Sequence, residues 1–150
     1  MLKPIIRVII IDDDPCCRDL LKVLLEQNGY EVISLTDPTV CPLFNGTECI
    51  CLQDDACSDF LLTDNKMPHM TGLEFVERQI NKGCKGMMAN KAVLSGSWEE
   101  KDLAEAERLG CQVFSKPYNI AEILAWLNER EKNILPGRKL AVFESHHFGP

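Results

Sequence analysis

The sequence predicts an α/β protein with a doubly wound, five-stranded, mainly parallel sheet. Apolar segments with strand character alternate with segments of helical pattern, and several of the strand segments end at an acidic or hydroxyl residue. The length of 150 residues suits one hydrophobic core rather than two. We therefore expect one domain over residues 1–135, followed by a short tail over residues 136–150.

The first strand and the first helix follow from the apolar pattern. Residues Ile5–Ile11 form a β-branched run that is interrupted only by Arg7, which is typical of a strand buried on both faces of a sheet. Asp14 is the predicted N-cap of the helix, Pro15 suits its first turn, and Asn28-Gly29 ends it. The predicted apolar face of this helix consists of Cys17, Leu20, Leu21, Leu24 and Leu25.

Four more short apolar runs predict the remaining strands. They lie at Glu31–Leu35, Phe60–Thr63, Lys91–Leu94 and about Gln112–Phe114. Parallel strands present their carboxyl ends at one edge of the sheet, where functional groups of such folds gather. The residues that follow these runs are therefore expected to meet in space.

Three further helices alternate with these strands. The predicted N-caps are Thr71, Ser97 and Asn119, and the helix that follows Ser97 ends at Leu109-Gly110. The predicted apolar faces are Leu73, Val76 and Ile80 in the first of these helices and Ile120, Ile123, Leu124 and Leu127 in the last.

The net charge and the N-terminal segment argue against a DNA-binding protein and against an exported or membrane protein. A formal net charge of -7 without a Lys/Arg-rich run argues against a protein whose main activity is direct DNA binding. The apolar stretch near the N-terminus is short and runs into three aspartates, so it fits neither a signal peptide nor a membrane span. We therefore expect a cytoplasmic protein that has no membrane partner.

Charged and hydroxyl residues end several of the predicted strands. Asp12, Asp13, Asp64, Ser95 and Lys116 fall at the same predicted edge of the sheet. Carboxylates that are forced together repel one another unless a cation is present, and Mg²⁺ is the natural cation for oxygen ligands. A cation, a lysine and a hydroxyl around one aspartate would stabilise a phosphoryl group during its transfer. The edge therefore predicts that Asp64 forms an aspartyl phosphate.

Four motifs make this hypothesis specific: IIIDDDP, LLTDNKMPHMTGLEF, AVLSGS and VFSKPY. In order and spacing, from about Ile5 to Arg130, they resemble the receiver domains of response regulators in two-component signalling, of the chemotaxis-regulator type. The resemblance implies a flavodoxin-like receiver fold and a Mg²⁺-dependent transfer of a phosphoryl group to Asp64 from a histidine kinase or phosphotransfer protein. It implies a signalling module without substrate turnover of its own.

The resemblance also assigns roles to the other residues of the edge. It implies that Asp13 binds Mg²⁺ directly together with Asp64, whereas Asp12 acts mainly through water. Lys66 would offer its backbone carbonyl to the metal. Ser95 would donate a hydrogen bond to the phosphoryl group, and Lys116 would pair with it. Pro117 is expected to follow a cis peptide bond, a state that is inexpensive only before proline.

Two positions depart from the family's pattern. The family usually places an aromatic residue three positions before the lysine, where this chain has Val113, and Phe114 comes one residue later. The aromatic switch of the family is therefore in question here. A long basic side chain at Lys66 is expected to shield the acyl phosphate from water, so we predict slow self-dephosphorylation.

A cysteine-rich segment at about residues 38–58 stands where the family has its second helix. Pro38, Pro42 and Asn45-Gly46 disfavour a regular helix there, so this helix is expected to be replaced or distorted. The segment contains the four cysteines Cys41, Cys49, Cys51 and Cys57. Four thiolates can bind zinc or an iron–sulfur cluster, but small apolar cysteines can equally pack into a loop, and no C-x-x-C pair is present. Both interpretations stay open.

The leading function is therefore a receiver that signals through a partner protein whose identity the sequence does not give. The resemblance implies that partners, or a second copy in a homodimer, use the surface from the fourth to the fifth helix of the family, near Trp98, Tyr118 and Trp126. The alternative is a cysteine-ligated metal or redox sensor on a receiver scaffold. A haloacid-dehalogenase-like phosphatase is disfavoured, because IIIDDDP is not D-x-D-x-[TV].

Overall fold

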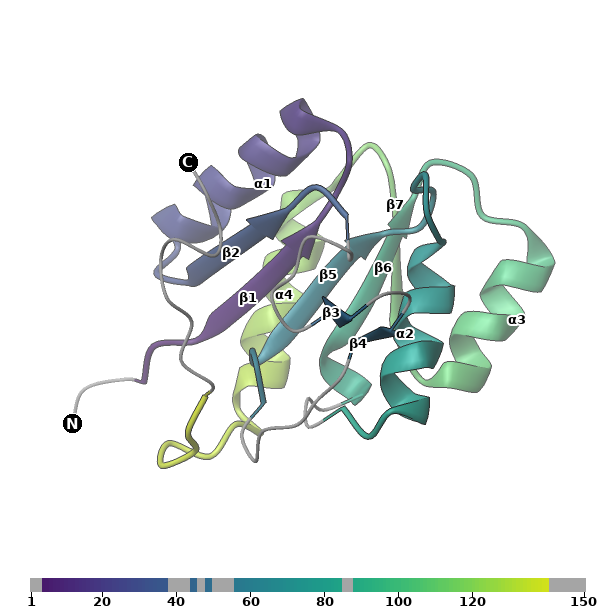
Figure 1. The fold of residues 1–150 in the computed structure, drawn as a ribbon. Coiled ribbons are helices and arrows are strands. Elements are labelled where there is room, and N and C mark those ends of the chain that lie inside the picture. Colours follow the sequence, from purple (N-terminus) through teal and green to yellow (C-terminus); the bar gives the residue numbers. More distant parts are fainter. Residues whose placement is uncertain (1–3, 38–43, 46–47, 50–55, 85–87, 141–150) are drawn as a thin grey trace.

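Five parallel strands form one sheet with the order β2-β1-β5-β6-β7 (Figure 1). The computed structural model describes residues 4–37, 44–45, 48–49, 56–84 and 88–140. The strands of the sheet are β1 (Arg7–Ile11), β2 (Glu31–Leu35), β5 (Phe60–Asp64), β6 (Lys91–Ser95) and β7 (Gln112–Ser115). The predicted five-stranded, doubly wound sheet is confirmed, and each predicted strand agrees with the structure to within two residues.

Helices cover both faces of this sheet. They are α1 (Pro15–Gln27), α2 (Gly72–Asn81), α3 (Glu100–Leu109) and α4 (Ile120–Glu131), with one short 3₁₀ turn, η2 (Met88–Asn90). Between β2 and β5 the described residues form no helix. They form the short antiparallel pair β3 (Phe44–Asn45) and β4 (Glu48–Cys49), and Ala56 makes an isolated bridge to Leu140. The predicted loss of the second helix is confirmed to that extent. Within the described ranges, no helix has the length and apolar character needed to cross a membrane.

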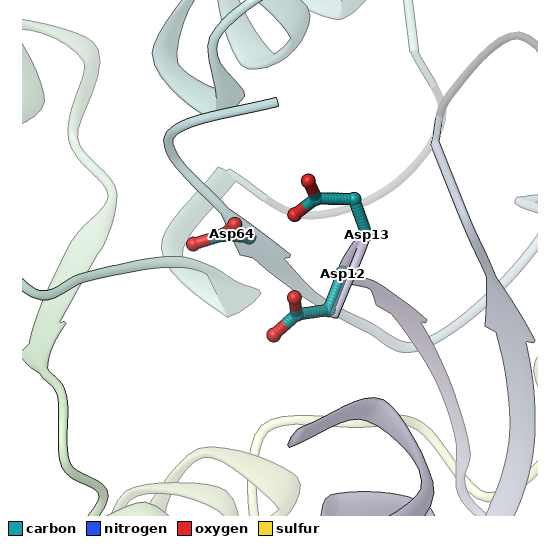
Figure 2. A group of neighbouring side chains, drawn as sticks. All are labelled: Asp12, Asp13 and Asp64. Atoms are coloured by element: carbon teal, nitrogen blue, oxygen red, sulfur yellow. The ribbon is translucent and has the colours of Figure 1, made fainter. Parts of the chain in front are cut away.

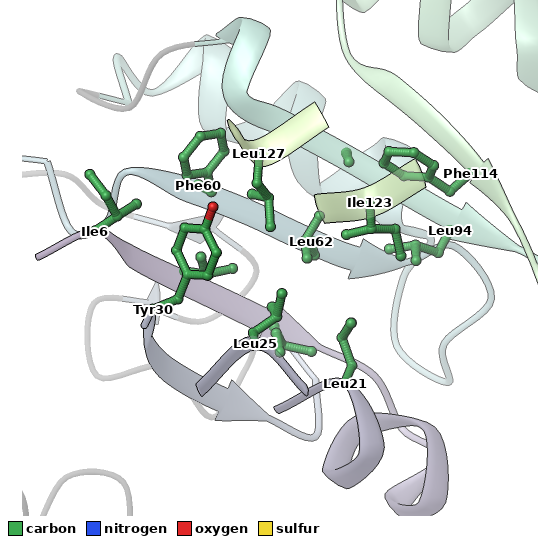
Figure 3. Close-up of a cluster of buried hydrophobic side chains, with 13 residues drawn as sticks. Ile6, Leu21, Leu25, Tyr30, Phe60, Leu62, Leu94, Phe114, Ile123 and Leu127 are labelled. Carbon is green, nitrogen blue, oxygen red and sulfur yellow. The ribbon is translucent and has the colours of Figure 1, made fainter. Parts of the chain in front are cut away.

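The core consists of two apolar layers, one on each face of the sheet. Figure 3 shows the layer beneath α1 and α4, in which Leu21, Leu25, Ile123 and Leu127 pack against strand residues such as Leu62. The second layer lies beneath α2 and α3 and includes Leu73, Val76, Ala106 and Leu109. Each side of the central strands is thus buried, which explains why their sequences are nearly continuous apolar runs.

The predicted apolar faces were too wide in two helices. Leu20 is 55% exposed and Ile80 is 43% exposed, so both predictions were wrong. Helix α1 contacts the sheet through a narrow stripe centred on Leu21 and Leu25, which leaves Leu20 at its border. In α2 the buried face is rotated toward Gln79, whose side-chain oxygen accepts a hydrogen bond from the buried amine of Lys91.

Most of the predicted helix ends are confirmed. The side chains of Asp14, Thr71 and Asn119 each accept a hydrogen bond from a backbone N–H in the first turn. Ser97 was the wrong N-cap for α3, which begins after Glu99. The backbone N–H and carbonyl of Ser97 both bond to the Ser95 hydroxyl, at 3.2 Å each, so Ser97 belongs to a turn before the helix.

A buried ion pair closes the amino-terminal end of β5. Asp59 lies just before this strand, is 8% exposed, and accepts two hydrogen bonds from Arg138, at 2.9 Å from Nε and 2.6 Å from a terminal nitrogen. The backbone N–H of Arg7 donates a third hydrogen bond to Asp59 at 2.9 Å. Arg138 lies in the predicted tail, so contacts with the domain continue beyond residue 135.

Candidate functional site

Three carboxylates meet at the carboxyl ends of two neighbouring strands. Asp12 and Asp13 directly follow β1, Asp64 ends β5, and these strands pair in parallel. One oxygen from each side chain lies within 4.8 Å of the others, and Figure 2 shows the three carboxylates directed to the same side. Asp12 is 2% exposed and Asp64 is 7% exposed, while Asp13 is open to solvent. The structure thus brings together the predicted acidic group.

Lys116 joins two of these carboxylates. Its Nζ lies 3.0 Å from an oxygen of Asp12 and 3.1 Å from an oxygen of Asp64. Burial by itself would lower the pKa of Lys116, but the hydrogen bonds to Asp12 and Asp64 outweigh this effect and raise it. The peptide bond between Lys116 and Pro117 is cis, as expected from the resemblance.

Asp64 is held in an unfavourable electrostatic environment. Burial is the largest effect and raises the pKa of Asp64, Lys116 partly opposes it, and Asp12 raises the pKa further, to about 6. The ordinary value for an aspartate is 3.8. The negative charge on Asp64 is therefore under-compensated when Lys116 is its cationic partner, and an additional cation would stabilise it.

Ser95 lies at the end of β6, and Lys66 lies in the loop after β5, two residues beyond Asp64. Ser95 ends β6, is 1% exposed, and lies one residue beyond Leu94, which pairs with Asp64 in the sheet. The Lys66 amine donates a hydrogen bond of 2.6 Å to the Ser97 hydroxyl and so connects the loop after β5 with the loop after β6. The predicted roles of Ser95 and of the Lys66 backbone carbonyl remain predictions.

Two residues that shape the loop after Asp64 were absent from the predicted site. Asn65 is 4% exposed; its side-chain oxygen accepts from the Leu73 N–H at 3.2 Å, and its carbonyl accepts from the Gly72 N–H at 2.8 Å. A Cβ atom on Gly72 would lie 2.5 Å from the backbone oxygen of Asp64, so this position has no room for a side chain. The M-T-G portion of the motif contained this signal, but periodicity does not reveal a close backbone approach.

Tyr118 is a third residue that sequence reasoning did not assign to the site. Its hydroxyl donates a hydrogen bond of 2.9 Å to Asp12, and Lys116 lies 5.7 Å from the centre of its ring. Burial, and then the charge of Asp12, raise the pKa of Tyr118, so its hydroxyl remains protonated. The position directly after Lys-Pro was the available signal, yet a tyrosine there reads equally well as a surface residue.

Phe114 and Val113, where the chain departs from the family's aromatic pattern, pack on opposite faces of the sheet. Phe114 points into the core, where its ring packs edge-on against Trp126 at a centroid distance of 5.7 Å. Val113 lies on the other face, in the same packed group as Trp98. The Trp98 indole donates a hydrogen bond of 2.9 Å to the Phe114 carbonyl and thereby connects the loop after β6 with β7.

The proposed cysteine site falls mainly outside the described residues. Cys41 and Cys51 are not described, and Cys49 is described only as part of β4. Cys57 is partly buried and packs against the core layer beneath α2 and α3. Nothing in the described part of the chain supports zinc or iron–sulfur binding, and the sensor alternative is not favoured.

The acidic group fits a hard divalent cation. Its donor atoms are all carboxylate oxygens, and within the described ranges it is the one group of three or more acidic, cysteine or histidine side chains close enough to share an ion. Mg²⁺ prefers such ligands, whereas structural zinc is bound mainly by sulfur and nitrogen. The three carboxylates Asp12, Asp13 and Asp64 could therefore hold Mg²⁺.

Comparison with known proteins identifies the family. Residues 8–128 match the model of the response regulator receiver domain. An uncharacterised 14.6 kDa protein from Leptolyngbya boryana is 31% identical over 78% of this chain and 83% of its own length. Sporulation initiation phosphotransferase F from Bacillus subtilis is 27% identical over 78% of this chain and 86% of its own length. Several other curated relatives are longer, and the match spans from 9% to 51% of them.

Solved structures show the same fold. The Vibrio cholerae chemotaxis protein CheY4 superimposes with a TM-score of 0.64 at 22% identity, covering 83% of this chain and 98% of that chain. Together with the family match, this shows that the chain belongs to the response regulator receiver domain family. Receiver domains are signalling modules that bind Mg²⁺ at their acidic pocket and accept a phosphoryl group from histidine kinases or phosphotransfer proteins. The chain is therefore a phosphoryl-accepting receiver domain.

Proposed function

We propose that Asp64 is the residue that accepts the phosphoryl group. One observation carries this assignment: Asp64 ends the central strand, is nearly buried, and lies beside Asp12, Asp13 and the amine of Lys116. A buried carboxylate with too few cationic partners is typical of a functional site rather than of a structural ion pair. Asp13 is exposed and would be the point of access for a cation.

The transfer uses groups that this chain supplies. An Asp64 oxygen forms a bond to phosphorus while the phosphorus–nitrogen bond of a donor phosphohistidine breaks, which gives an aspartyl phosphate. Lys116 then pairs with a phosphoryl oxygen, and the Ser95 hydroxyl donates a hydrogen bond to another. Bound Mg²⁺ supplies positive charge against the charge that develops on the phosphoryl oxygens. Asp13, Asp64 and the backbone carbonyl of Lys66 would hold it directly, and Asp12 through water.

The output is proposed to be a protein contact. The surface formed by α3, β7 and α4 carries Trp98 and Trp126, which are partly buried and would respond to a change in the loop after β6. A downstream partner or a second copy of the chain would bind there. We further propose a cytoplasmic location, no direct DNA binding, and a domain of residues 1–135 followed by a tail of residues 136–150, of which Arg138 is bonded to the domain.

Phosphate uptake tests the assignment. The protein is incubated with Mg²⁺ and a small acyl phosphate donor, and its intact mass is measured before and after hydroxylamine. We expect one hydroxylamine-labile phosphate in the wild type and none in Asp64→Asn. Asp19→Asn, which removes an exposed aspartate from α1, should behave like the wild type. Equal uptake by wild type and Asp64→Asn would refute the assignment.

A further inference from the structure

Tyr118 connects the acidic site to the start of the last helix. It follows the cis Lys116–Pro117 bond and directly precedes Asn119, the N-cap of α4. Its ring packs against the core layer beneath α1 and α4, while its hydroxyl lies 2.9 Å from Oδ2 of Asp12. Because the ring is packed and the chain enters a capped helix directly after it, the hydroxyl has a fixed position relative to Asp12.

The hydrogen bonds of Asp12 show what this hydroxyl contributes. A carboxylate has two oxygens with two acceptor positions each. Oδ1 of Asp12 accepts from the Asp14 backbone N–H at 2.9 Å. Oδ2 accepts both from Lys116 at 3.0 Å and from Tyr118 at 2.9 Å, so both of its positions are filled. The remaining acceptor position of Asp12 is therefore on Oδ1.

The two donors to Oδ2 differ in what else they contact. Lys116 is shared between Asp12 and Asp64, so a phosphoryl group on Asp64 would compete for its amine. The bond from Tyr118 goes to Asp12. Asp12 is 2% exposed and needs a hydrogen-bond donor if Lys116 moves away, because an unpaired buried carboxylate is costly.

We propose that Tyr118 is a positioning residue of the acidic site. Its hydroxyl holds Oδ2 of Asp12, which leaves Oδ1 available toward a divalent cation, and it keeps Asp12 in place when Lys116 turns to a phosphoryl group. The proposal deepens the proposed function and rests on it for the phosphorylated state. Its cation-binding part concerns the protein before any phosphoryl transfer and is tested there.

The chain offers a matched control, because it contains two tyrosines. The Tyr30 hydroxyl also contacts a carboxylate, that of Glu131 at 3.0 Å, and the side chain of Asn128 at 3.1 Å. Both Tyr118→Phe and Tyr30→Phe remove one hydroxyl and keep the ring. Only Tyr118 touches the acidic group, so a general effect of losing a buried hydroxyl should appear in both variants.

Calorimetric titration of the full chain with MgCl₂, without a phosphodonor, measures the first consequence. We expect Tyr118→Phe to bind Mg²⁺ about fivefold more weakly than the wild type, because part of the binding free energy would then be used to fix Asp12 in place. Tyr30→Phe should stay within about twofold, a difference well below that of one hydrogen bond. Unchanged affinity in Tyr118→Phe, or equal weakening in both variants, would overturn the proposal.

A spectroscopic measurement on the unsubstituted protein covers the case in which Tyr118→Phe fails to fold. Incorporation of 3-fluorotyrosine gives two fluorine resonances, and Tyr30→Phe assigns them. Saturation with MgCl₂ should shift the Tyr118 resonance and leave that of Tyr30 in place. An unmoved Tyr118 resonance overturns the proposal. A shifted resonance in a protein that takes up no phosphate supports Tyr118 as a positioning residue and refutes the role of Asp64.

Discussion

Strand β5 has a buried aspartate at each end, and the two differ in how fully their negative charge is compensated by neighbouring groups. Asp59, at the amino-terminal end, has a dedicated partner in Arg138, which donates two hydrogen bonds, and receives a third from the Arg7 backbone. Asp64, at the carboxyl-terminal end, shares one lysine with Asp12 and has Asp13 beside it. The exposed fractions are almost equal, 8% and 7%. Burial alone therefore does not distinguish a structural from a functional carboxylate, whereas the balance of charge around it does.

The largest expected effect is at the carboxyl-terminal end of β5. Lys116→Met removes the cation that the structure pairs with Asp64, and we expect phosphate uptake to slow by about 10² to 10³-fold, as when a donor that stabilises transferred charge is lost. Initial rates with a small acyl phosphate in Mg²⁺ measure this. Arg138→Met is the control and should retain the wild-type rate to within about twofold, because its ion pair is at the other end of the strand. Equal slowing of phosphate uptake in both variants would contradict a role for the carboxyl-terminal end of β5 that is distinct from that of the amino-terminal end.

The second largest effect is a loss of stability when the ion pair at the amino-terminal end of β5 is broken. Arg138→Met leaves the buried Asp59 without its cation and should lower the free energy of unfolding by about 3 kcal/mol in urea denaturation. Arg108→Met removes an arginine that also pairs with two carboxylates but is 57% exposed, and should lower the free energy of unfolding far less, because exposed ion pairs are screened by solvent. Similar losses in the two variants would contradict the structural role of the Asp59–Arg138 pair.

A smaller gain in stability is expected when Asp64 is neutralised. The folded protein raises the pKa of Asp64 from the ordinary 3.8 to about 6, so the free energy of unfolding falls as the pH rises from about 4 to about 6 and stays lower above that range. Asp64→Asn does not pay this cost. In EDTA at pH 8, the free energy of unfolding of Asp64→Asn should exceed that of the wild type by about 1 to 2 kcal/mol, and the difference should be smaller at pH 5. Asp59→Asn should instead be destabilised at both pH values. A variant Asp64→Asn no more stable than the wild type at pH 8 would contradict the charge deficit.

The smallest effect concerns the lifetime of the acyl phosphate. The Lys66 side chain extends from the loop after β5 to Ser97, and in that position it would limit the access of water to Asp64. Lys66→Ala should shorten the half-life of the phosphorylated protein about threefold, since water exclusion slows hydrolysis of a reactive intermediate. Loss of radiolabelled phosphate after removal of the donor measures this. Lys132→Ala, at an exposed lysine near the end of α4, should leave the half-life unchanged.

The side chains that meet at the carboxyl-terminal end of β5 could be predicted from the sequence, whereas those at the amino-terminal end could not. Asp12, Asp13, Asp64 and Lys116 follow short strands within motifs, and parallel topology brings such positions together. Arg138 lies 79 residues from Asp59 in a segment without strand or helix pattern, so no local signal connects the two. For the same reason the contact between Tyr118 and Asp12, 106 residues apart, needed the structure.

Local packing accounts for the other differences. Leu20 and Ile80 satisfy helical periodicity, but each helix meets the sheet along a stripe narrower than its apolar face. Ser97 has the spacing of a capping box, yet its backbone N–H and carbonyl are hydrogen-bonded to the hydroxyl of Ser95 in a turn before the helix. Competition between two local hydrogen-bond patterns is not visible from spacing alone.

The most direct test of the central claim is to locate the phosphate. The wild-type chain is phosphorylated in Mg²⁺, reduced with borohydride, which converts an acyl phosphate to an alcohol, and analysed by peptide mass spectrometry. The charge deficit at the carboxyl-terminal end of β5 predicts homoserine at position 64 and unmodified aspartate at positions 12, 13 and 59. Reduction at any of those three positions, with Asp64 intact, would contradict the account.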